Sequence, residues 1–570
     1  MGRGEVPLKL LLINPTIVGE PEAFHVGLAT IGTFVAKSGR HGATILDFAF
    51  HRANWEARLR ARIESYEPDI IGIYVSTPYF PSARKVAAEI KRIRPGLRVL
   101  AGGHHATLAP EQVIADGSID MLIVGEGELP VLELLDTLER GGDLHQVPGL
   151  WWKDGDAVHK QEKGPLLPAE RIPILDWTLY DDETLRQSFF TFGLLPIMGS
   201  RGCPYRCSFC AITNVQRLYR GESFYRYRDP IEVVDEIELH YERFKSYGLR
   251  IVYFYDLNFL IRPEWLAAFT TEYRRRGLNL KLPWSAYTRA DHVSKIALDC
   301  LADSGCVGLR VGIEAANETM RNDVYEKDLP QAELLDALAR LKAARIPIIG
   351  YFLVGGPGER PEYLMESLEL AYDYGIEYPT FFLFKPLAGT DVVERAAEMG
   401  SVVDVESMGD SADFLRGVNM KHRFISKRQI VGFHFLTLVV FGTRIVWHQL
   451  RREKLAYVPR FVRFFIESLR RDFSPFESLI YFVFYGYDHL ISPPRFPVPE
   501  RRSVFARLLF KTLRLFMRSH ETGDVSAEAL AAATVVRAPE PEGALVQLGV
   551  PARAQPGASP STDVMSSSSS

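Results

Sequence analysis

Short apolar runs alternate with amphipathic stretches along residues 8–140 of the chain. Runs rich in β-branched residues predict buried strands, and apolar residues recurring every three or four positions predict helices. The predicted strands are Leu8–Asn14, Ala43–Phe48, Asp69–Ser76, Arg98–Gly102 and Asp120–Val124, and the predicted helices are Gly27–Ser38, Asn54–Tyr66, Ser82–Ile93, Pro110–Ala115 and Leu129–Leu138. This order predicts an α/β domain with a doubly wound parallel sheet, whose ligands lie at the carboxyl ends of the strands.

The same alternation resumes between Phe192 and Arg395. Strands are predicted at Leu194–Met198, Arg250–Tyr255, Leu282–Thr288, Val307–Ile313, Pro347–Val354 and Thr380–Phe384. Six strand–helix units predict a partial (β/α)6 version of the TIM barrel, with its site at the carboxyl ends of the strands.

Residues 401–520 are predicted to be helical, aromatic and basic, with aromatic runs at Phe464-Phe465 and Tyr481–Tyr487 and basic pairs at Arg451-Arg452, Arg470-Arg471 and Arg501-Arg502. Two interpretations stay open: a helical cap across the barrel, or basic amphipathic faces that bind a membrane surface. The apolar stretch Ile430–Val446 contains His434 and Arg444, so we expect a buried or interfacial helix rather than a spanning one.

Length and composition predict several domains and limit the functional classes to which the protein can belong. At 570 residues it exceeds one hydrophobic core. We expect a first domain at 1–145, a linker at 146–190, a barrel at 191–400, a helical C-terminal region at 401–520 and a disordered tail at 521–570, where Ala, Pro, Glu, Gly and Ser predominate. A net charge of −4 without a compact basic motif argues against nucleic-acid binding. Few cysteines and no signal-peptide pattern favour a reducing, cytoplasmic location.

Three cysteines in one short run, Cys203, Cys207 and Cys210, have the spacing C-x3-C-x2-C. Three thiolates on one loop can hold three irons of a [4Fe–4S] cluster and leave the fourth iron open to another molecule. A zinc knuckle needs a fourth ligand nearby, and the next candidate is His240. Cys300 and Cys306 cannot complete a second cluster and are expected to pack in the interior.

This run, with Phe209 before the third cysteine, resembles the signature of the radical S-adenosylmethionine (SAM) enzymes. The resemblance implies that the three cysteines ligate the cluster, whose open iron binds SAM and cleaves it to a 5′-deoxyadenosyl radical. It also implies SAM contacts from later segments. These are Asp256 as acceptor for the amino group, Arg289 as a carboxylate partner (a surface salt bridge is the alternative), Glu314 in a G-x-E element, and Gly355 and Gly356 beside the adenine. Phe209 is assigned to the same SAM-binding set.

The first domain resembles the cobalamin-binding domain that precedes many radical SAM domains, most closely at Gly102–Thr107 and Val124–Glu128. The resemblance implies cobalamin contacts from Asn14, Ser76, Thr77, Gly102, Gly103, His105, Gly125, Glu126 and Gly127. The D-x-H-x-x-G motif is missing, because Phe48-Ala49 follows Asp47, so no histidine is expected on the lower face of the cobalt. The alternative is a flavodoxin-like domain without a cofactor, in which His104 and His105 make loop hydrogen bonds.

Together the two resemblances imply a cobalamin-dependent radical SAM enzyme that methylates an unactivated carbon of a lipophilic or natural-product substrate. One alternative uses the same cofactors for oxidative cyclisation or rearrangement, as in the anaerobic porphyrin-ester cyclase branch. Another is a cobalamin or redox sensor without turnover. The expected partners are a small-molecule substrate, a low-potential electron donor of the flavodoxin or ferredoxin type and, through the C-terminal helices, a membrane surface.

Overall fold

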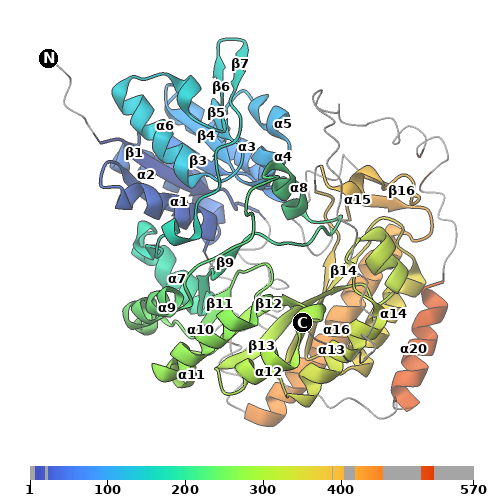
Figure 1. Cartoon of the computed structure of the whole chain (residues 1–570). Helices are drawn as coiled ribbons and strands as arrows, with labels where there is room; N and C mark the ends of the chain where they lie inside the picture. The colour runs from blue at the N-terminus through green and yellow to red at the C-terminus, as the bar shows by residue number, and fades with distance from the viewer. Residues whose placement is uncertain are drawn as a thin grey trace, which may run out of the picture.

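A computed structural model of the chain describes residues 7–18, 24–387, 389–403, 418–453 and 504–518, with a few single positions. Figure 1 shows two α/β units, the first coloured blue to cyan and the second green to yellow. The first sheet has seven strands in the order β2 (Gly42–Asp47), β1 (Lys9–Asn14), β3 (Ile70–Tyr74), β4 (Arg98–Gly102), β5 (Met121–Ile123), β6 (Leu150–Asp154) and β7 (Ala157–Lys160). Strands β1–β5 are parallel and confirm the doubly wound sheet.

Both faces of the first sheet are buried because its strands alternate between two cores. Leu10 and Leu12 of β1 join one hydrophobic cluster, and Leu11 and Ile13 join the other. Helices α1 (Val26–Lys37) and α6 (Glu128–Arg140) cover the first face, and α2 (Trp55–Tyr66), α3 (Phe80–Ile93) and α5 (Pro110–Ile114) cover the second. The short helix α4 (His104–Leu108) follows β4 at the carboxyl edge.

The antiparallel hairpin β6–β7 is absent from the sequence prediction, which assigned its residues to a linker. It pairs with β5 and extends the sheet. Gly155, in its turn, has a φ of 58°, which explains why an Asp-Gly pair stands there. The domain boundaries at residues 145 and 190 stay a prediction.

The second sheet has six parallel strands in the order β15 (Tyr378–Leu383), β14 (Ile348–Val354), β13 (Cys306–Glu314), β12 (Trp284–Arg289), β11 (Ile251–Phe254) and β8 (Leu194–Ile197). All six predicted strands are therefore confirmed. The helices of this unit are α7 (Asp182–Phe192), α8 (Ala211–Leu218), α9 (Pro230–Phe244), α10 (Pro263–Arg275), α11 (Leu278–Lys281), α12 (Lys295–Leu301), α13 (Gln331–Ala343), α14 (Pro361–Asp373) and α15 (Asp391–Glu394). Two short antiparallel pairs complete it, β9 (Ser200–Arg201) with β10 (Arg226–Tyr227) and β16 (Ser401–Val403) with β17 (Met420–His422).

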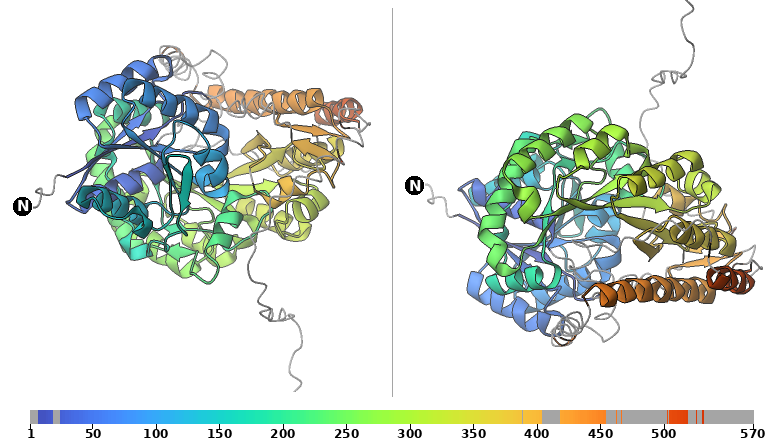
Figure 2. Two further views of the ribbon diagram at one scale, coloured as in Figure 1. Left: turned by 90° about the horizontal axis from the view of Figure 1, so that it is seen from above. Right: turned by 90° about the horizontal axis from the view of Figure 1, so that it is seen from below.

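Two further helices, α16 (Lys427–Glu453) and α20 (Val504–Phe516), lie together beside the second sheet (Figure 2). Buried Phe433 and Phe441 of α16 contact the ring of Phe381 on the edge strand β15, so α16 covers the open edge of the partial barrel. The segment Lys427–Trp447 is long and apolar enough to cross a membrane, and 39% of its apolar window is buried inside the protein. Core helices of soluble proteins meet the same criterion.

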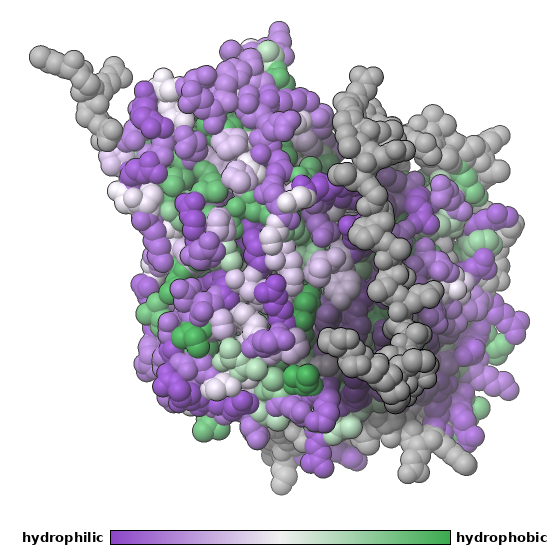
Figure 3. Space-filling view, in the orientation of Figure 1, coloured by the Kyte–Doolittle hydropathy of each residue, from purple (hydrophilic) through white to green (hydrophobic). Residues whose placement is uncertain are grey.

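The aromatic runs at Phe464-Phe465 and Tyr481–Tyr487, and the tail predicted to be disordered from residue 521, lie outside the described residues apart from single positions. On the face shown in Figure 3, hydrophobic side chains are scattered among hydrophilic ones over the described part of the surface.

Candidate active site

The cysteine loop connects β9 to α8 at the carboxyl end of the second sheet. Cys203, Cys207 and Cys210 are half-buried free thiols. Burial raises the pKa of all three, that of Cys210 to about 12. The Cys207 carbonyl accepts hydrogen bonds from the Cys210 N–H at 3.1 Å and from the Thr213 hydroxyl at 3.0 Å, which folds the loop against α8.

A buried arginine stands beside this loop. Arg289, 6% exposed at the end of β12, directs Nη1 toward Cys207 Sγ at 3.6 Å and donates from Nη2 to the Lys327 carbonyl at 2.7 Å. It also pairs with Asp291 at 2.9 Å and lies 3.8 Å from the ring centre of Tyr205. Arg289 thus forms a salt bridge with Asp291 that is buried beside the candidate ligands rather than at the surface, and its contact with the SAM carboxylate stays a prediction.

Glu314 and Lys327 form a second charged pair next to Arg289. Lys327 Nζ lies 2.8 Å from Glu314 Oε1, and the lysine side chain is 4% exposed. Glu314 ends β13 with a φ of 63°, a left-handed conformation that costs energy for a residue with a Cβ atom. The turn points its carboxylate back over Gly312, where a Cβ atom would lie 2.6 Å from Glu314 Oε1. The G-x-E element thus brings a carboxylate, an ammonium and a guanidinium together at the carboxyl ends of β12 and β13.

Asp256, which follows β11, is fully buried at 1% exposure. Its carboxylate accepts hydrogen bonds from the Gly199 N–H at 2.9 Å and the Ser200 hydroxyl at 2.5 Å, both just before the cysteine loop. Burial raises the pKa of Asp256 to about 6. The structure thus connects this carboxylate to the backbone of the loop, and its predicted contact with the SAM amino group stays a prediction.

Phe209 and Gly356 lie against a tyrosine that the sequence analysis did not single out, whereas Gly355 lies against Ile430 of α16. The rings of Phe209 and Tyr325 are 5.3 Å apart, edge to face. A Cβ atom at Gly356 would collide with the Tyr325 hydroxyl, and Gly355 has a φ of 79°. The Tyr325 hydroxyl is buried without a hydrogen-bond partner among the described residues. The predicted glycine-rich element therefore packs against Tyr325 and presents an unsatisfied polar atom.

The predicted cobalamin contacts follow the ends of β1, β3, β4 and β5, which are neighbours in the first sheet. Gly103 has a φ of 112°, and a Cβ atom there would lie 2.7 Å from the Val75 carbonyl. Gly102 faces open space. His105 Nδ1 lies 3.1 Å from the Thr77 hydroxyl, whereas its Nε2 is buried without a hydrogen-bond partner among the described residues. Burial lowers the pKa of His105 to about 4, so the ring is neutral.

Asn14 and Ser76 complete this edge differently. Ser76 is half-buried after β3, like Thr77 and Pro78 that follow it. The Asn14 amide is 2% exposed and bonds inward, donating to Asp47 Oδ2 at 3.0 Å and accepting from the Thr16 hydroxyl at 2.9 Å. In the structure, Asn14 thus stabilises the carboxyl edge through hydrogen bonds within the protein, and its contact with cobalamin stays a prediction.

The loop Gly125–Glu128 contacts the second unit. A Cβ atom at Gly125 would collide with the Tyr219 hydroxyl, which accepts the Glu126 N–H at 2.9 Å. The Glu126 carboxylate pairs with Arg226, and Glu128 pairs with Arg201 at 2.6 Å. Gly127 packs under α1, where a Cβ atom would meet Ile31 at 2.8 Å. The carboxylates of this loop are therefore directed at the barrel.

The residues present fit the implied groups. Soft sulfur donors on one loop suit an iron–sulfur cluster, and the buried, unpaired Tyr325 hydroxyl lies beside the element predicted to hold SAM. Glycines at the edge of the first sheet let a large flat ligand approach the backbone, and the unpaired Nε2 of His105 offers it a polar contact.

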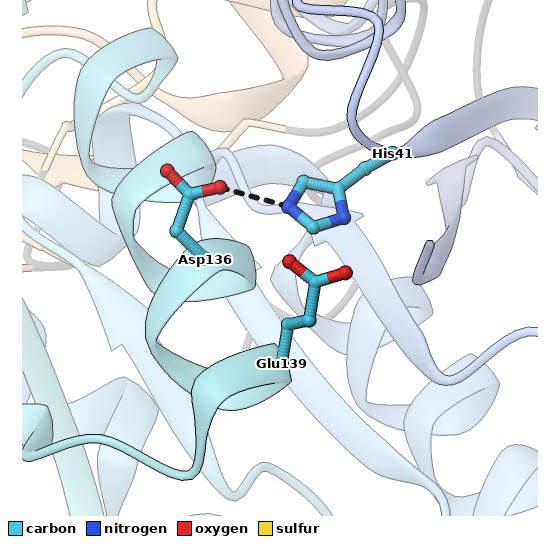
Figure 4. Close-up of side chains that lie close together, drawn as sticks. All are labelled: His41, Asp136 and Glu139. Carbon is cyan, nitrogen blue, oxygen red and sulfur yellow. Dashed lines mark hydrogen bonds and ion pairs between the residues drawn. The ribbon is translucent and has the colours of Figure 1, made fainter. Parts of the chain in front are cut away.

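A separate group of potential metal ligands lies at the amino end of β2 and on α6: His41, Asp136 and Glu139 (Figure 4). His41 Nδ1 accepts the Leu8 N–H at 3.2 Å, so Nε2 carries the proton and donates to Asp136 Oδ1 at 2.9 Å. Arg40 pairs with the other oxygen of Asp136 at 2.5 Å. Both ring nitrogens are thus engaged within the fold, and this group connects β2 to α6 rather than offering a metal site.

Sequence reasoning missed Lys327, Tyr325, Tyr219, Arg201 and Arg226 as site residues. Lys327 contacts Glu314 13 positions earlier, the other four contact residues farther away in the chain, and none of the five belongs to a recognisable motif. A weak signal exists for Arg201, which lies two positions before Cys203.

Two family models match the chain. The model described as Radical SAM superfamily matches residues 197–371, and the model described as B12 binding domain matches residues 17–135. The first match contains the cysteine loop, and the second contains most of the carboxyl edge of the first sheet.

Known proteins and structures agree with these matches. An uncharacterized methyltransferase of Pyrococcus horikoshii is 28% identical over 375 residues, which cover 65% of this chain and 78% of the relative. An anaerobic magnesium-protoporphyrin IX monomethyl ester cyclase of Cereibacter sphaeroides is 30% identical over 361 residues, which cover 61% of this chain and 56% of the relative. The radical S-adenosylmethionine methyltransferase TsrM of Kitasatospora setae, with cobalamin and a [4Fe–4S] cluster bound, aligns with a TM-score of 0.58 and 21% identity over 70% of this chain and 78% of that one. At that identity the alignment shows a shared fold.

Proposed function

Because this chain belongs to the cobalamin-dependent radical SAM enzymes, we propose that it methylates an unactivated carbon atom of a small-molecule substrate. The observation that carries the proposal is the meeting of the two carboxyl edges. The loop Gly125–Glu128 of the first sheet bonds to Arg201 and Arg226, which flank the cysteine loop of the second. A methyl carrier in one unit and a radical source in the other would therefore face one site.

When bound, the cluster and SAM would provide the radical that removes a hydrogen atom from an unreactive carbon, and cobalamin would provide the methyl group. The three cysteines hold the cluster. Arg289 places its guanidinium beside Cys207 Sγ and thereby stabilises negative charge on the thiolates. Lys327 and Glu314 offer opposite charges to the zwitterionic end of SAM.

The experiment is anaerobic reconstitution of the full chain with iron and sulfide, followed by SAM, hydroxocobalamin, a low-potential reductant and pooled small-molecule extracts. Mass analysis should find both 5′-deoxyadenosine and S-adenosylhomocysteine, with omission of cobalamin removing the S-adenosylhomocysteine. Absence of both nucleosides under reducing conditions would contradict the proposal.

A second candidate is cyclisation or rearrangement with the same cofactors. It is favoured by the similarity to a protein named as a porphyrin-ester cyclase, 30% identical. The same assay separates the two, because this reaction yields 5′-deoxyadenosine without stoichiometric S-adenosylhomocysteine.

We further propose that the substrate is lipophilic and that the protein binds membrane surfaces peripherally. Support comes from exposed apolar side chains on one stretch of α16, where Phe435 is 55% and Trp447 59% exposed. Arg451 lies 4.6 Å from the Trp447 ring and adds a positive charge beside it. An exposed aromatic next to a basic residue is typical of interfacial binding. An electron donor of the flavodoxin or ferredoxin type is proposed from the family alone.

A further inference from the structure

Four charged side chains cross the boundary between the two units next to the cysteine loop. Glu126 comes from the loop after β5 and Glu128 is the first residue of α6, whereas Arg201 and Arg226 come from the paired strands β9 and β10. We call these four residues the acid–base quartet. Arg201 Nη2 lies 2.6 Å from Glu128 Oε1, Arg201 Nη1 lies 3.7 Å from Glu126 Oε2, and Arg226 Nη1 donates to Glu126 Oε2 at 3.2 Å.

The quartet is largely shielded from water. The side chains of Glu128 and Arg226 are 5% and 9% exposed, and those of Arg201 and Glu126 are 12% and 18% exposed. Two acids and two bases make it electrically neutral. Buried ion pairs add little net stability, because desolvation opposes their attraction, but loss of one partner leaves an uncompensated charge. Such a group fixes a geometry more effectively than it stabilises a fold.

The position of the quartet indicates which geometry it fixes. Arg201 and Arg226 are direct partners in the β9–β10 pair, and Cys203 follows two residues later. On the other side, Glu126 lies in the loop after β5 and Glu128 begins α6, at the carboxyl edge assigned to cobalamin. Glu126 is held further by the Leu167 N–H at 2.8 Å and by its own N–H to the Tyr219 hydroxyl. A shift of either loop would break these contacts together.

We propose that the acid–base quartet couples the cobalamin pocket to the cluster loop, so that each cofactor, once bound, favours the loop geometry that the other requires. This inference rests on the proposed function. Glu126 and Glu128 are then positioning residues, and not the cobalamin contacts that sequence resemblance suggested for Glu126. By linkage, cluster assembly tightens cobalamin binding by the same factor that cobalamin stabilises the cluster loop.

The test measures the dissociation constant of hydroxocobalamin by anaerobic equilibrium dialysis, with the full chain either cluster-free or reconstituted. In the wild type, cluster assembly should strengthen binding about fivefold or more, the lower end of typical coupling. In Glu126→Gln/Glu128→Gln the two constants should agree within about twofold. Arg201→Met removes one of the two barrel arginines, the partner of Glu128, without altering the first sheet and should weaken the coupling, whereas Arg201→Lys keeps the charge and should retain more of it.

Glu183→Gln is the matched control, because Glu183 pairs with Arg58 at 3.0 Å between α7 and α2, away from the cysteine loop. It should leave the coupling factor unchanged. As a second readout, hydrogen exchange of residues 199–210 should slow on adding hydroxocobalamin to the wild type but not to the Arg201→Met variant.

Three results would overturn the inference: equal wild-type constants with and without cluster, unchanged coupling in Arg201→Met, or loss of cobalamin binding from both states of the double glutamine variant, which would make the glutamates direct contacts. If the wild type binds no cobalamin in either state, the proposed function itself is contradicted. That result differs from the three above, so the two failures can be told apart.

Discussion

The thiols of the cysteine loop illustrate how a single residue type sets the chemistry of the site. Burial raises the pKa of all three, so the free protein holds them as neutral thiols, and iron binding must displace their protons. Arg289 and Lys327 lie close enough to lower the pKa of Cys207 and so offset part of this effect. The loop is therefore arranged to favour thiolates once metal is present.

Single replacement of Cys203, Cys207 or Cys210 by Ala should abolish the visible absorbance of the cluster and all SAM cleavage, because no spare thiol lies in the loop. Iron content and 5′-deoxyadenosine are the measurements. Cys300→Ala is the control, since Cys300 lies on α12 and should leave both unchanged. Full iron content in any one loop variant would show that the cluster assignment is wrong.

Glu359 makes the pH dependence of stability testable at a single carboxyl. Burial raises its pKa to about 8, although it accepts the Gly355 N–H at 3.1 Å. A carboxyl whose folded pKa is raised contributes stability below its unfolded pKa, and this is lost as pH rises toward the folded value. This group alone should therefore contribute a decrease in the free energy of unfolding between about pH 5 and pH 8, with a slope of at most about 1.4 kcal/mol per pH unit.

Thermal unfolding of the full chain at several pH values measures that slope. Glu359→Gln should flatten it, while Glu362→Gln, an exposed position on the neighbouring turn of α14, should not. Equal slopes in the wild type and Glu359→Gln would contradict the prediction.

At the scale of elements, the carboxyl edge of the first sheet predicts the coordination of its cofactor. The sequence lacks the D-x-H-x-x-G histidine. Electron paramagnetic resonance of the Co(II) form in the full chain should therefore show no nitrogen superhyperfine splitting from an imidazole. A splitting that disappears in His105→Ala would refute this.

The helix α16 allows a matched test of its role at the barrel edge. Phe433 is 1% exposed against the Phe381 ring, whereas Phe435 is 55% exposed two positions later. Phe433→Ala should lower the free energy of unfolding by about 3–5 kcal/mol, and Phe435→Ala by less than about 0.5 kcal/mol. Chemical denaturation measures both. Similar effects of the two changes would mean that α16 does not cover the edge as described.

Elements were more predictable than their contacts. The six barrel strands follow from the sequence because each is a short run rich in apolar and aromatic residues, although β12 and β13 also contain polar ones. The β6–β7 hairpin was missed because its strands contain few apolar residues, chiefly Trp151, Trp152 and Val158, and so show no clear strand pattern. The Asp-Gly pair in its turn was a usable signal. The bonds of Asp256 to Gly199 and of Glu126 to Arg226 span 57 and 100 residues. Such choices of partner depend on the packed fold, which local patterns do not encode.

For the whole molecule, we predict binding to anionic membrane surfaces, and this prediction rests on the exposed side of α16. The full chain should sediment with anionic vesicles at low salt and be released at high salt, because each basic residue near the surface contributes about 1 kcal/mol. Trp447→Glu should reduce binding about tenfold or more without loss of fold, since the side chain is 59% exposed. If the wild type stays in solution at low salt, α16 serves the barrel alone.

The segment around Trp177, which joins the two units, affects how substrates and products can reach and leave the site. Trp177 is fully buried between the two units. Its ring centre lies 5.0 Å from that of Phe24 in the first unit and 6.5 Å from that of His240 on α9 in the second. Its neighbours are held as well, the Leu175 N–H by Glu236 at 2.9 Å and the Asp176 N–H by Thr33 at 2.9 Å. A connector bonded on both sides does not act as a hinge. We therefore expect the two halves to stay together throughout the catalytic cycle, with reactants and products entering and leaving between loops.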